Sequence, residues 1–268
     1  MSCATCHIEE KAFTDGIAVR KGLSRNAPTL TYAGFQKAFF HEGRAGSLEG
    51  QIVGVVKNEN EFNHSIDDLV DSIQADSNYS LRFLQLYNRK PNSLVIRNAI
   101  ASYIRSLAPF SSKFDQAMRK EVELTEMEIE GFNLFTGKAA CATCHFPPLF
   151  NGTVPPQYQE SEFENLGTPE HLDKPWSINP DIGRMAVFDN PARKHFFKTP
   201  TVRNSEQTAP YMHNGVFETL EELMDFYNNG GLLGTGVENE LQTLPGDSLH
   251  LTQKEIQSVI AFLKTLND

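Results

Sequence analysis

The chain has 268 residues, a formal net charge of −10 at pH 7 and 40% hydrophobic residues. This length suits two domains of ordinary size, and the acidic balance argues against a nucleic-acid surface, which needs a basic patch. No run of 18 apolar residues occurs, so no membrane-spanning helix is expected. No secretory signal peptide precedes the first motif, and we interpret the sequence as a mature form, a fragment or a product of a misplaced start.

One cysteine motif occurs twice, as Cys-Ala-Thr-Cys-His at 3–7 and again at 141–145. Zinc does not require a histidine after each cysteine pair, and this spacing suits an internal disulfide poorly. Attachment of heme c explains all three residues, because two thiols add to the vinyl groups and the adjacent histidine ligates the iron. We therefore predict a diheme c-type cytochrome. The predicted heme-binding residues are Cys3, Cys6, His7, Cys141, Cys144 and His145.

The segments that follow the two motifs repeat one pattern. Pro28-Thr29-Leu30 and Pro200-Thr201-Val202 precede His41 and His213 by the same interval. Ser47-Leu48-Glu49 and Thr219-Leu220-Glu221 open the next segments at matching offsets. This similarity predicts an internal duplication with a long period.

Amphipathic helices are predicted at 93–107 and 252–266, where each half closes, and at 125–137 before the second motif. The segment at 252–266 begins with a capping box. Nothing like 125–137 precedes Cys3, so the first domain is expected to lack its opening helix. With a boundary near Lys120, the predicted fold is all-α, with long loops and two cytochrome c-like domains at 1–120 and 121–268, each around one covalently bound heme.

Further segments resemble the bacterial diheme cytochrome c peroxidase family, which includes MauG. They are Arg25–Thr29, Gly43–Ala45 with Gln51, Lys198–Asn204 and Thr208–Gly215. The resemblance covers nearly the whole chain. It implies that the N-terminal heme, on His7, is the peroxide site and that the C-terminal heme, on His145, relays electrons.

The resemblance also implies two residues that act on peroxide. Glu61 resembles the acid–base residue of the family by its offset from Gln51, which resembles the distal amide. Heterolysis needs a base that moves a proton between the two oxygens and a polar group that orients the peroxide. The alternative for Glu61 is a solvated carboxylate in a polar run.

Two departures from the family pattern bear on mechanism. The loop Ile8–Ser24 contains no histidine, whereas typical peroxidases have a distal histidine there, so we expect an open iron that needs no reductive activation. Tyr227 stands where the usual peroxidase has a ligating methionine, and MauG has tyrosine there. An oxygen ligand would lower the heme potential, whereas a thioether would raise it. The rival ligands are Met224, Met212 and Met185, for which core packing is the alternative.

Two histidines and a calcium ion complete the expected sites. His41 stands where peroxidases usually have a tryptophan between the hemes, and it either alters this electron path or binds a heme propionate. His213, in the matching place, is expected to be structural or to bind a propionate. The family also holds calcium between its domains, and the matching positions are Asn26, Thr208 and Pro210.

The favoured hypothesis is a periplasmic diheme peroxidase that reduces hydrogen peroxide at the N-terminal heme with electrons relayed through the C-terminal heme. One alternative is a MauG-like enzyme that oxidises residues of a partner protein through a high-valent diheme state. Another is a non-catalytic diheme electron carrier. The donor is expected to be a cytochrome c, a cupredoxin or an oxidisable protein substrate, and a homodimer is left open.

Overall fold

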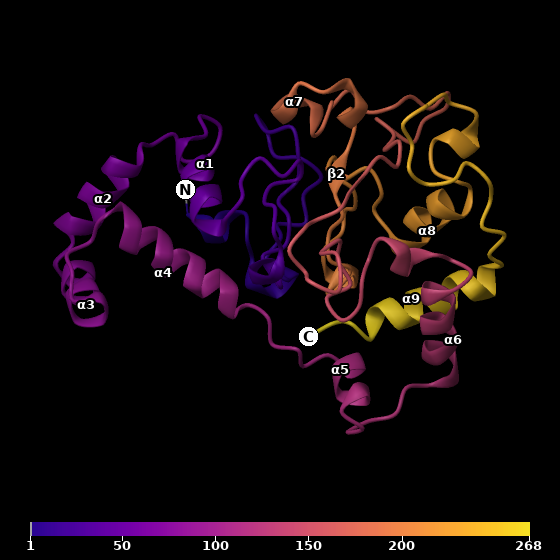
Figure 1. The fold of residues 1–268 in the computed structure, drawn as a ribbon, viewed down its shortest axis with the longest axis horizontal. Helices are drawn as coiled ribbons and strands as arrows, with labels where there is room; N and C mark the ends of the chain where they lie inside the picture. The colour runs from indigo at the N-terminus through magenta and orange to yellow at the C-terminus, as the bar shows by residue number, and fades with distance from the viewer. Residues whose placement is uncertain (1) are drawn as a thin grey trace.

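A computed structural model describes residues 2–268, and helices dominate its regular structure (Figure 1). The first half contains α1 (Leu48–Lys57), α2 (Ile66–Ala75), α3 (Ser77–Tyr87), α4 (Ser93–Ser106) and α5 (Lys113–Met118). The second contains α6 (Glu126–Thr136), α7 (Met185–Phe188), α8 (Leu220–Asn228) and α9 (Gln253–Lys264), with a short antiparallel pair of strands, β1 (Phe163–Glu164) and β2 (Phe197–Lys198). The predicted helical fold with long loops is confirmed.

The three amphipathic helices form where the sequence places them, and their ends have local causes. The side chain of Thr125 accepts a hydrogen bond from the backbone of Glu128 at the start of α6, and Thr252 does the same with Glu255 at the start of α9. In return, each glutamate carboxylate accepts a bond from the backbone nitrogen of its threonine. Two donors that the start of a helix leaves free are thereby satisfied. Gly137 follows α6 directly.

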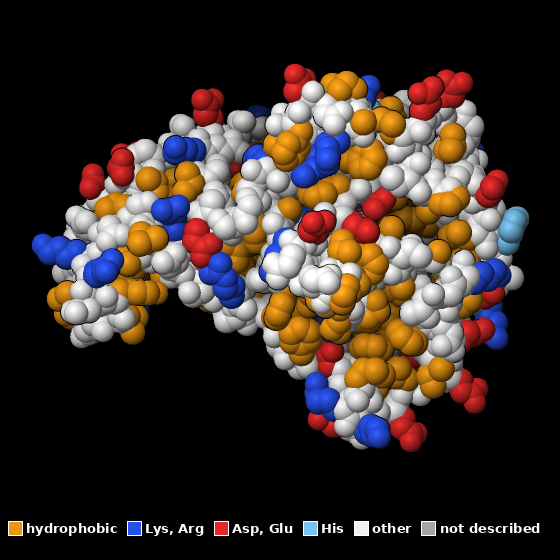
Figure 2. Space-filling model, viewed as in Figure 1, with side chains coloured by type: hydrophobic (Ala, Val, Ile, Leu, Met, Phe, Trp, Pro, Cys, Tyr) orange, Lys and Arg blue, Asp and Glu red, His pale blue; other side chains and the backbone are white. Residues whose placement is uncertain are grey.

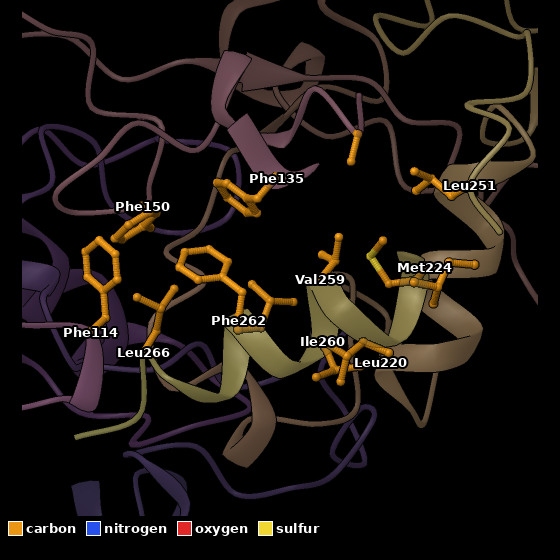
Figure 3. Close-up of a cluster of buried hydrophobic side chains, with 13 residues drawn as sticks. Phe114, Phe135, Phe150, Leu220, Met224, Leu251, Val259, Ile260, Phe262 and Leu266 are labelled. Carbon is orange, nitrogen blue, oxygen red and sulfur yellow. The ribbon is translucent and has the colours of Figure 1, made fainter. Parts of the chain in front are cut away.

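The core of the second half lies where α6 crosses α9 (Figure 3). Phe262 of α9 stands at its centre, with the rings of Phe114, Phe135 and Phe150 packed edge-on at centroid distances of 5.2–5.7 Å. The two helices approach closely at Gly131, where an added Cβ would lie 1.9 Å from the carbonyl oxygen of Ser258. Only glycine therefore allows this crossing.

We expect Gly131→Ala to lower the free energy of unfolding by about 1–3 kcal/mol, because the methyl group forces the two helices apart. Gly46→Ala is the matched control, since nothing lies within 4 Å of the position of its added Cβ. Urea unfolding followed by circular dichroism would compare the two midpoints. Equal midpoints would show that α6 and α9 can separate at little cost.

The first half has a smaller core between α1, α4 and the turn Ala33–Phe35. Leu48, Ile52 and Ala101 are buried there. The hairpin of α2 and α3 borders this core through Ile66 and Leu69 but contains no buried residue. Leu81 and Leu86 of α3 are exposed. Figure 2 shows apolar side chains gathered at this end of the molecule.

The two halves are joined by more than the connecting segment. Phe114 of α5 packs in the core of the second half, and its backbone nitrogen donates to the carbonyl of Thr265 at 2.9 Å. Lys198, on β2, donates from its backbone nitrogen to the carbonyl of His41 at 2.7 Å. The boundary near Lys120 stays a prediction. No helix within residues 2–268 is long and apolar enough to cross a membrane.

Candidate active site

Each cysteine motif forms a single 3-10 turn that places its histidine beside its first cysteine. The backbone nitrogen of His7 donates to the carbonyl of Cys3 at 3.0 Å, and that of His145 donates to Cys141 at 2.9 Å. Both imidazoles also bond through Nδ1, His7 with the carbonyl of Phe13 at 2.9 Å and His145 with that of Pro200 at 3.0 Å. Because a carbonyl only accepts, Nδ1 carries the proton and Nε2 keeps a free lone pair.

The protonation states fit metal ligation by histidine. Burial lowers the pKa of His7, and burial lowers the pKa of His145 to about 4. Both rings are therefore neutral at pH 7, as a metal-ligating imidazole must be. The bond from Nδ1 to a carbonyl is the outer contact that commonly orients such a ligand.

The cysteines do not gather into a zinc site. All four are free thiols. Within residues 2–268, the one group of three side chains close enough to share a metal ion joins Cys144 to the carboxylates of Glu162 and Glu164. Burial also raises the pKa of Cys141 to about 12, which disfavours the thiolate that zinc requires. Two separate pairs of thiols, each beside a neutral histidine, fit covalent heme attachment better.

The segment Pro200–Asn204 holds the loop that follows the second motif. The hydroxyl of Thr201 donates to the carbonyl of Leu149 at 2.9 Å, and the guanidinium of Arg203 donates to Pro148. In the first half, Thr29 makes the matching bond to Ala12 at 2.6 Å. The repeated sequence pattern thus forms a similar bond from a threonine hydroxyl to a backbone carbonyl in each half.

A cavity of about 340 Å³ lies beside the first motif. It brings Cys6 together with Glu61, although these residues lie far apart in the sequence. The remaining wall comes mainly from the loop that lacks a histidine. The full lining is Cys6, Ile17, Val19, Arg20, Lys21, Leu23, Asn60 and Glu61.

Glu61 is positioned by a tight turn directly after α1. Asn58 ends the helix, and its carbonyl accepts the backbone nitrogen of Glu61 at 3.0 Å. The side-chain amide of Asn58 donates to the Glu61 carboxylate at 2.6 Å. Burial raises the pKa of Glu61 above its ordinary value, against the lowering effects of Asn58 and Arg44. Glu61 is therefore half-buried and held in place, which differs from a solvated carboxylate in a polar run.

Gln51 lies on α1, the helix that leads into this turn, and is half-buried. Across residues 2–268 its side-chain amide makes no hydrogen bond, and Gln51 does not line the cavity, so its role toward peroxide stays a prediction. Asn58 was not among the predicted site residues. Its position three residues before Glu61 could have identified it from the sequence, because an asparagine can organise a turn of this size.

The loop Ile8–Ser24, which forms much of the cavity wall, is held by contacts with the first motif and with the second half. Arg20 donates to the Asp15 carboxylate at 2.5 Å and to the carbonyl of Thr5 at 2.7 Å, which ties the loop to the first motif. Ala18 packs on the second half, where a Cβ added to Gly215 would come within 2.4 Å of its Cα. Gly215 has a φ of +65°, so glycine suits both the backbone and the contact.

Tyr227, on α8, lies beside the second motif. Burial raises the pKa of its phenol, and the nearby Cys141, Cys144 and Glu164 raise it further. Met224 is one helical turn away and is buried among Leu220, Leu251 and Val259 (Figure 3). This packing supports the core alternative for Met224, and the choice of ligand between Tyr227 and Met224 stays a prediction.

We expect Tyr227→Met to raise the reduction potential of the second heme by on the order of 0.1 V, within the roughly 0.8 V over which axial ligands act. The cause would be the exchange of the predicted oxygen ligand for a thioether. Met224→Leu is the control and should leave the potential unchanged, because a volume-conserving swap alters only packing. Spectropotentiometric titration measures both. A shift in Met224→Leu but not in Tyr227→Met would make Met224 the ligand.

The two matched histidines lie near each other between the halves. Burial lowers the pKa of His41 to about 4, and its Nε2 donates to the carbonyl of Asn26 at 3.1 Å. Burial lowers the pKa of His213 to about 3, with a further contribution from His41. The His213 ring stacks on Phe197 with centroids 3.9 Å apart. Both are neutral at pH 7, and their roles toward a heme stay predictions.

Asn26 connects the halves at the expected calcium position. Its side-chain amide lies 3.2 Å from the carbonyl of Pro210 and 2.7 Å from that of Met212. The hydroxyl of Thr208 donates to Ser205. Asn26 and Pro210 are thus in direct contact, and a calcium ion between them would need the amide oxygen of Asn26 in place of its nitrogen, because calcium takes oxygen ligands. Calcium binding stays a prediction.

Comparison with known proteins agrees with this geometry. The family model described as di-haem cytochrome c peroxidase matches residues 1–123. Cytochrome-c peroxidase IdrP2 of Pseudomonas sp. is 30% identical over all of this chain and 76% of its own length. MauG, the methylamine utilization protein of Methylorubrum extorquens, is 29% identical over 99% of this chain and 72% of its own.

A solved structure has the same fold over the whole chain. It is a MauG-like protein associated with microbial copper homeostasis, with a TM-score of 0.82 and 28% identity over 100% of this chain and 84% of its own. The heme-type motifs, the neutral histidines and the sequence similarity all agree. The chain therefore belongs to the diheme cytochrome c peroxidase and MauG family of heme oxidoreductases.

Proposed function

We propose that this protein carries two covalently bound hemes and reduces hydrogen peroxide at the heme attached to Cys3 and Cys6, with electrons relayed through the heme attached to Cys141 and Cys144. The observation that carries the proposal is the shared cavity of Cys6 and Glu61. The cavity supports the proposal because it brings a carboxylate able to transfer protons next to the first heme-attachment motif. A simple electron carrier does not need such a group.

When bound, the heme would supply the iron that takes up peroxide and the electrons that cleave its O–O bond. His7 would hold that iron through Nε2, because its Nδ1 proton is donated to Phe13. Glu61 would accept the proton of one peroxide oxygen and return it to the other. The raised pKa of Glu61 suits this role, since a base works best near the operating pH.

The surrounding residues keep the carboxylate ready for that transfer. The Asn58 amide fixes one Glu61 oxygen and leaves the other for the peroxide. Gln51, whose amide has no partner within residues 2–268, would orient the substrate by a hydrogen bond. The loop Ile8–Ser24 offers no histidine that could occupy the iron, so peroxide would enter without prior reduction of the enzyme.

A MauG-like oxidation of a partner protein is the second candidate. The position of Tyr227 beside Cys141 and Cys144 favours it, because an oxygen ligand stabilises the more oxidised iron. His145 and Tyr227 would then be the axial pair of the second heme.

We also propose a periplasmic location, domains at 1–120 and 121–268, and calcium held by Asn26, Thr208 and Pro210.

Protein matured by a cytochrome c assembly system would test the proposal. Mass spectrometry should find two hemes, and electron paramagnetic resonance should find a high-spin ferric signal that disappears when peroxide is added. Steady-state turnover with a reduced cytochrome c or cupredoxin would identify peroxidase activity. Two low-spin hemes that are inert to peroxide would contradict the proposal and favour an electron carrier.

A further inference from the structure

Trp176 is the only tryptophan in the sequence and lies in the long insertion between the second motif and Pro200. It is half-buried, and its indole Nε1 donates to the carbonyl of Leu172 at 2.8 Å. The inner side of the ring packs on the small apolar cluster of Phe217, Phe226 and Leu232. One part of the indole is therefore accessible from the surface, and another contacts the interior of the second half.

A continuous series of aromatic contacts leads inward from this residue. The ring centroids of Trp176 and Phe226 are 6.3 Å apart, and those of Phe226 and Tyr227 are 6.0 Å apart. Phe226 is buried, so no solvent separates the rings. Tyr227 lies near Cys141 and Cys144. The series thus connects the surface to the second heme-attachment motif.

The chemistry of the three rings differs along this path. Indole loses an electron more readily than the other aromatic side chains, whereas the phenyl ring of Phe226 is not oxidised under such conditions and only fills the gap. The carbonyl of Leu172 accepts a bond from the indole N–H, and this bond strengthens when the ring becomes positively charged. A phenylalanine could pack against Phe226 as well, so packing alone does not require a tryptophan.

We propose that Trp176 is the residue through which single electrons pass from a redox protein at the surface to the second heme. The proposal rests on the proposed peroxidase function. One hydrogen peroxide takes up two electrons and two protons and yields two water molecules. Each electron leaves the indole as a one-electron oxidation, and a one-electron donor protein restores the neutral ring. No bond of the indole forms or breaks.

The test uses matured protein with both hemes and compares the wild type with Trp176→Phe. The variant should react with peroxide at the wild-type rate but lose donor-dependent turnover by about tenfold or more. Trp176→Tyr should retain more turnover than Trp176→Phe, because phenol is also oxidisable. Phe188→Leu, which changes an exposed aromatic ring elsewhere in the insertion, is the control and should turn over as the wild type does.

A second measurement does not depend on turnover. When wild-type protein receives peroxide without a donor, peptide mass spectrometry should find oxygen atoms added to Trp176. Phe226→Leu keeps the indole but interrupts the aromatic contact, and it should reduce this modification. An unmodified Trp176 together with normal turnover of Trp176→Phe would overturn the inference while the peroxidase function stands. A wild type that does not react with peroxide would overturn both.

Discussion

Glu61→Gln should slow the reaction of the matured protein with hydrogen peroxide by about 10²–10⁴-fold, the range that a positioned general base contributes. The amide keeps the shape of the side chain and can still accept a bond from Asn58, but it cannot take up a proton. Both hemes should remain attached, because Glu61 contacts neither histidine. Stopped-flow absorbance after peroxide addition measures the rate, and mass spectrometry measures the heme content.

Glu59→Gln is the matched control for this experiment. It removes the same charge two residues away, but its side chain is exposed and does not line the cavity. The control should react at the wild-type rate. Asn58→Ala should fall between the two, since the carboxylate would remain but lose its 2.6 Å bond. Equal rates for Glu61→Gln and Glu59→Gln would exclude Glu61 as the base.

The helices at 93–107, 125–137 and 252–266 could be predicted because their signals are local. The capping boxes of Thr125 and Thr252 and the apolar spacing of 93–107 need no knowledge of distant residues. The path of the insertion could not be predicted in this way. Strands β1 and β2 pair over only two residues each, which is too short for a pattern in the sequence. The single tryptophan of the insertion contacts Phe226 only because the fold brings the two together.

The candidate site also combines features that a local sequence pattern specifies with features that only tertiary contacts create. The two cysteine motifs are contiguous, so the sequence alone specifies which residues lie together. Glu61 was separated from a solvated carboxylate only by its offset from Gln51, and its neighbours Arg20 and Asn58 were not foreseen. The loop of Arg20 reaches the cavity through the Asp15 and Thr5 contacts, which are tertiary and leave no regular spacing in the sequence. The packing of α8, which buries Met224 in the core, likewise follows no local pattern, and Tyr227 as a ligand stays a prediction.

Arg203 should be the most costly residue to truncate outside the heme motifs. Its side chain is fully buried, and it donates two bonds to the Asp115 carboxylate, both at 2.8 Å. It also lies over the ring of Tyr32 at 4.7 Å and donates to the carbonyl of Pro148, three residues after His145. Arg203 therefore joins the first half, α5 and the loop behind the second heme site at one point.

Arg203→Met should lower the free energy of unfolding by about 3–5 kcal/mol, because it leaves the Asp115 carboxylate buried without a compensating charge, with the hydroxyl of Ser112 still bonded to it. Adding Asp115→Asn should recover part of this loss, since the uncompensated charge is removed. Arg119→Ala, which breaks an exposed ion pair with Glu121, should leave the urea midpoint unchanged. If the double variant were as unstable as Arg203→Met, the loss would come from packing on Tyr32 and not from the charge.

The difference in stability between the wild type and Arg203→Met should depend on pH, in a direction that the pKa of Asp115 determines. Burial alone would raise the pKa of Asp115, but the bonds from Arg203 and Ser112 outweigh it and hold the pKa below its ordinary value. The pair therefore stabilises the fold fully above the unfolded pKa of about 3.9 and is lost as the pH falls through the folded value. The gap in urea midpoint between wild type and Arg203→Met should be largest near neutral pH and should narrow in acid. A gap that widened in acid would mean that Asp115 is protonated in the folded protein.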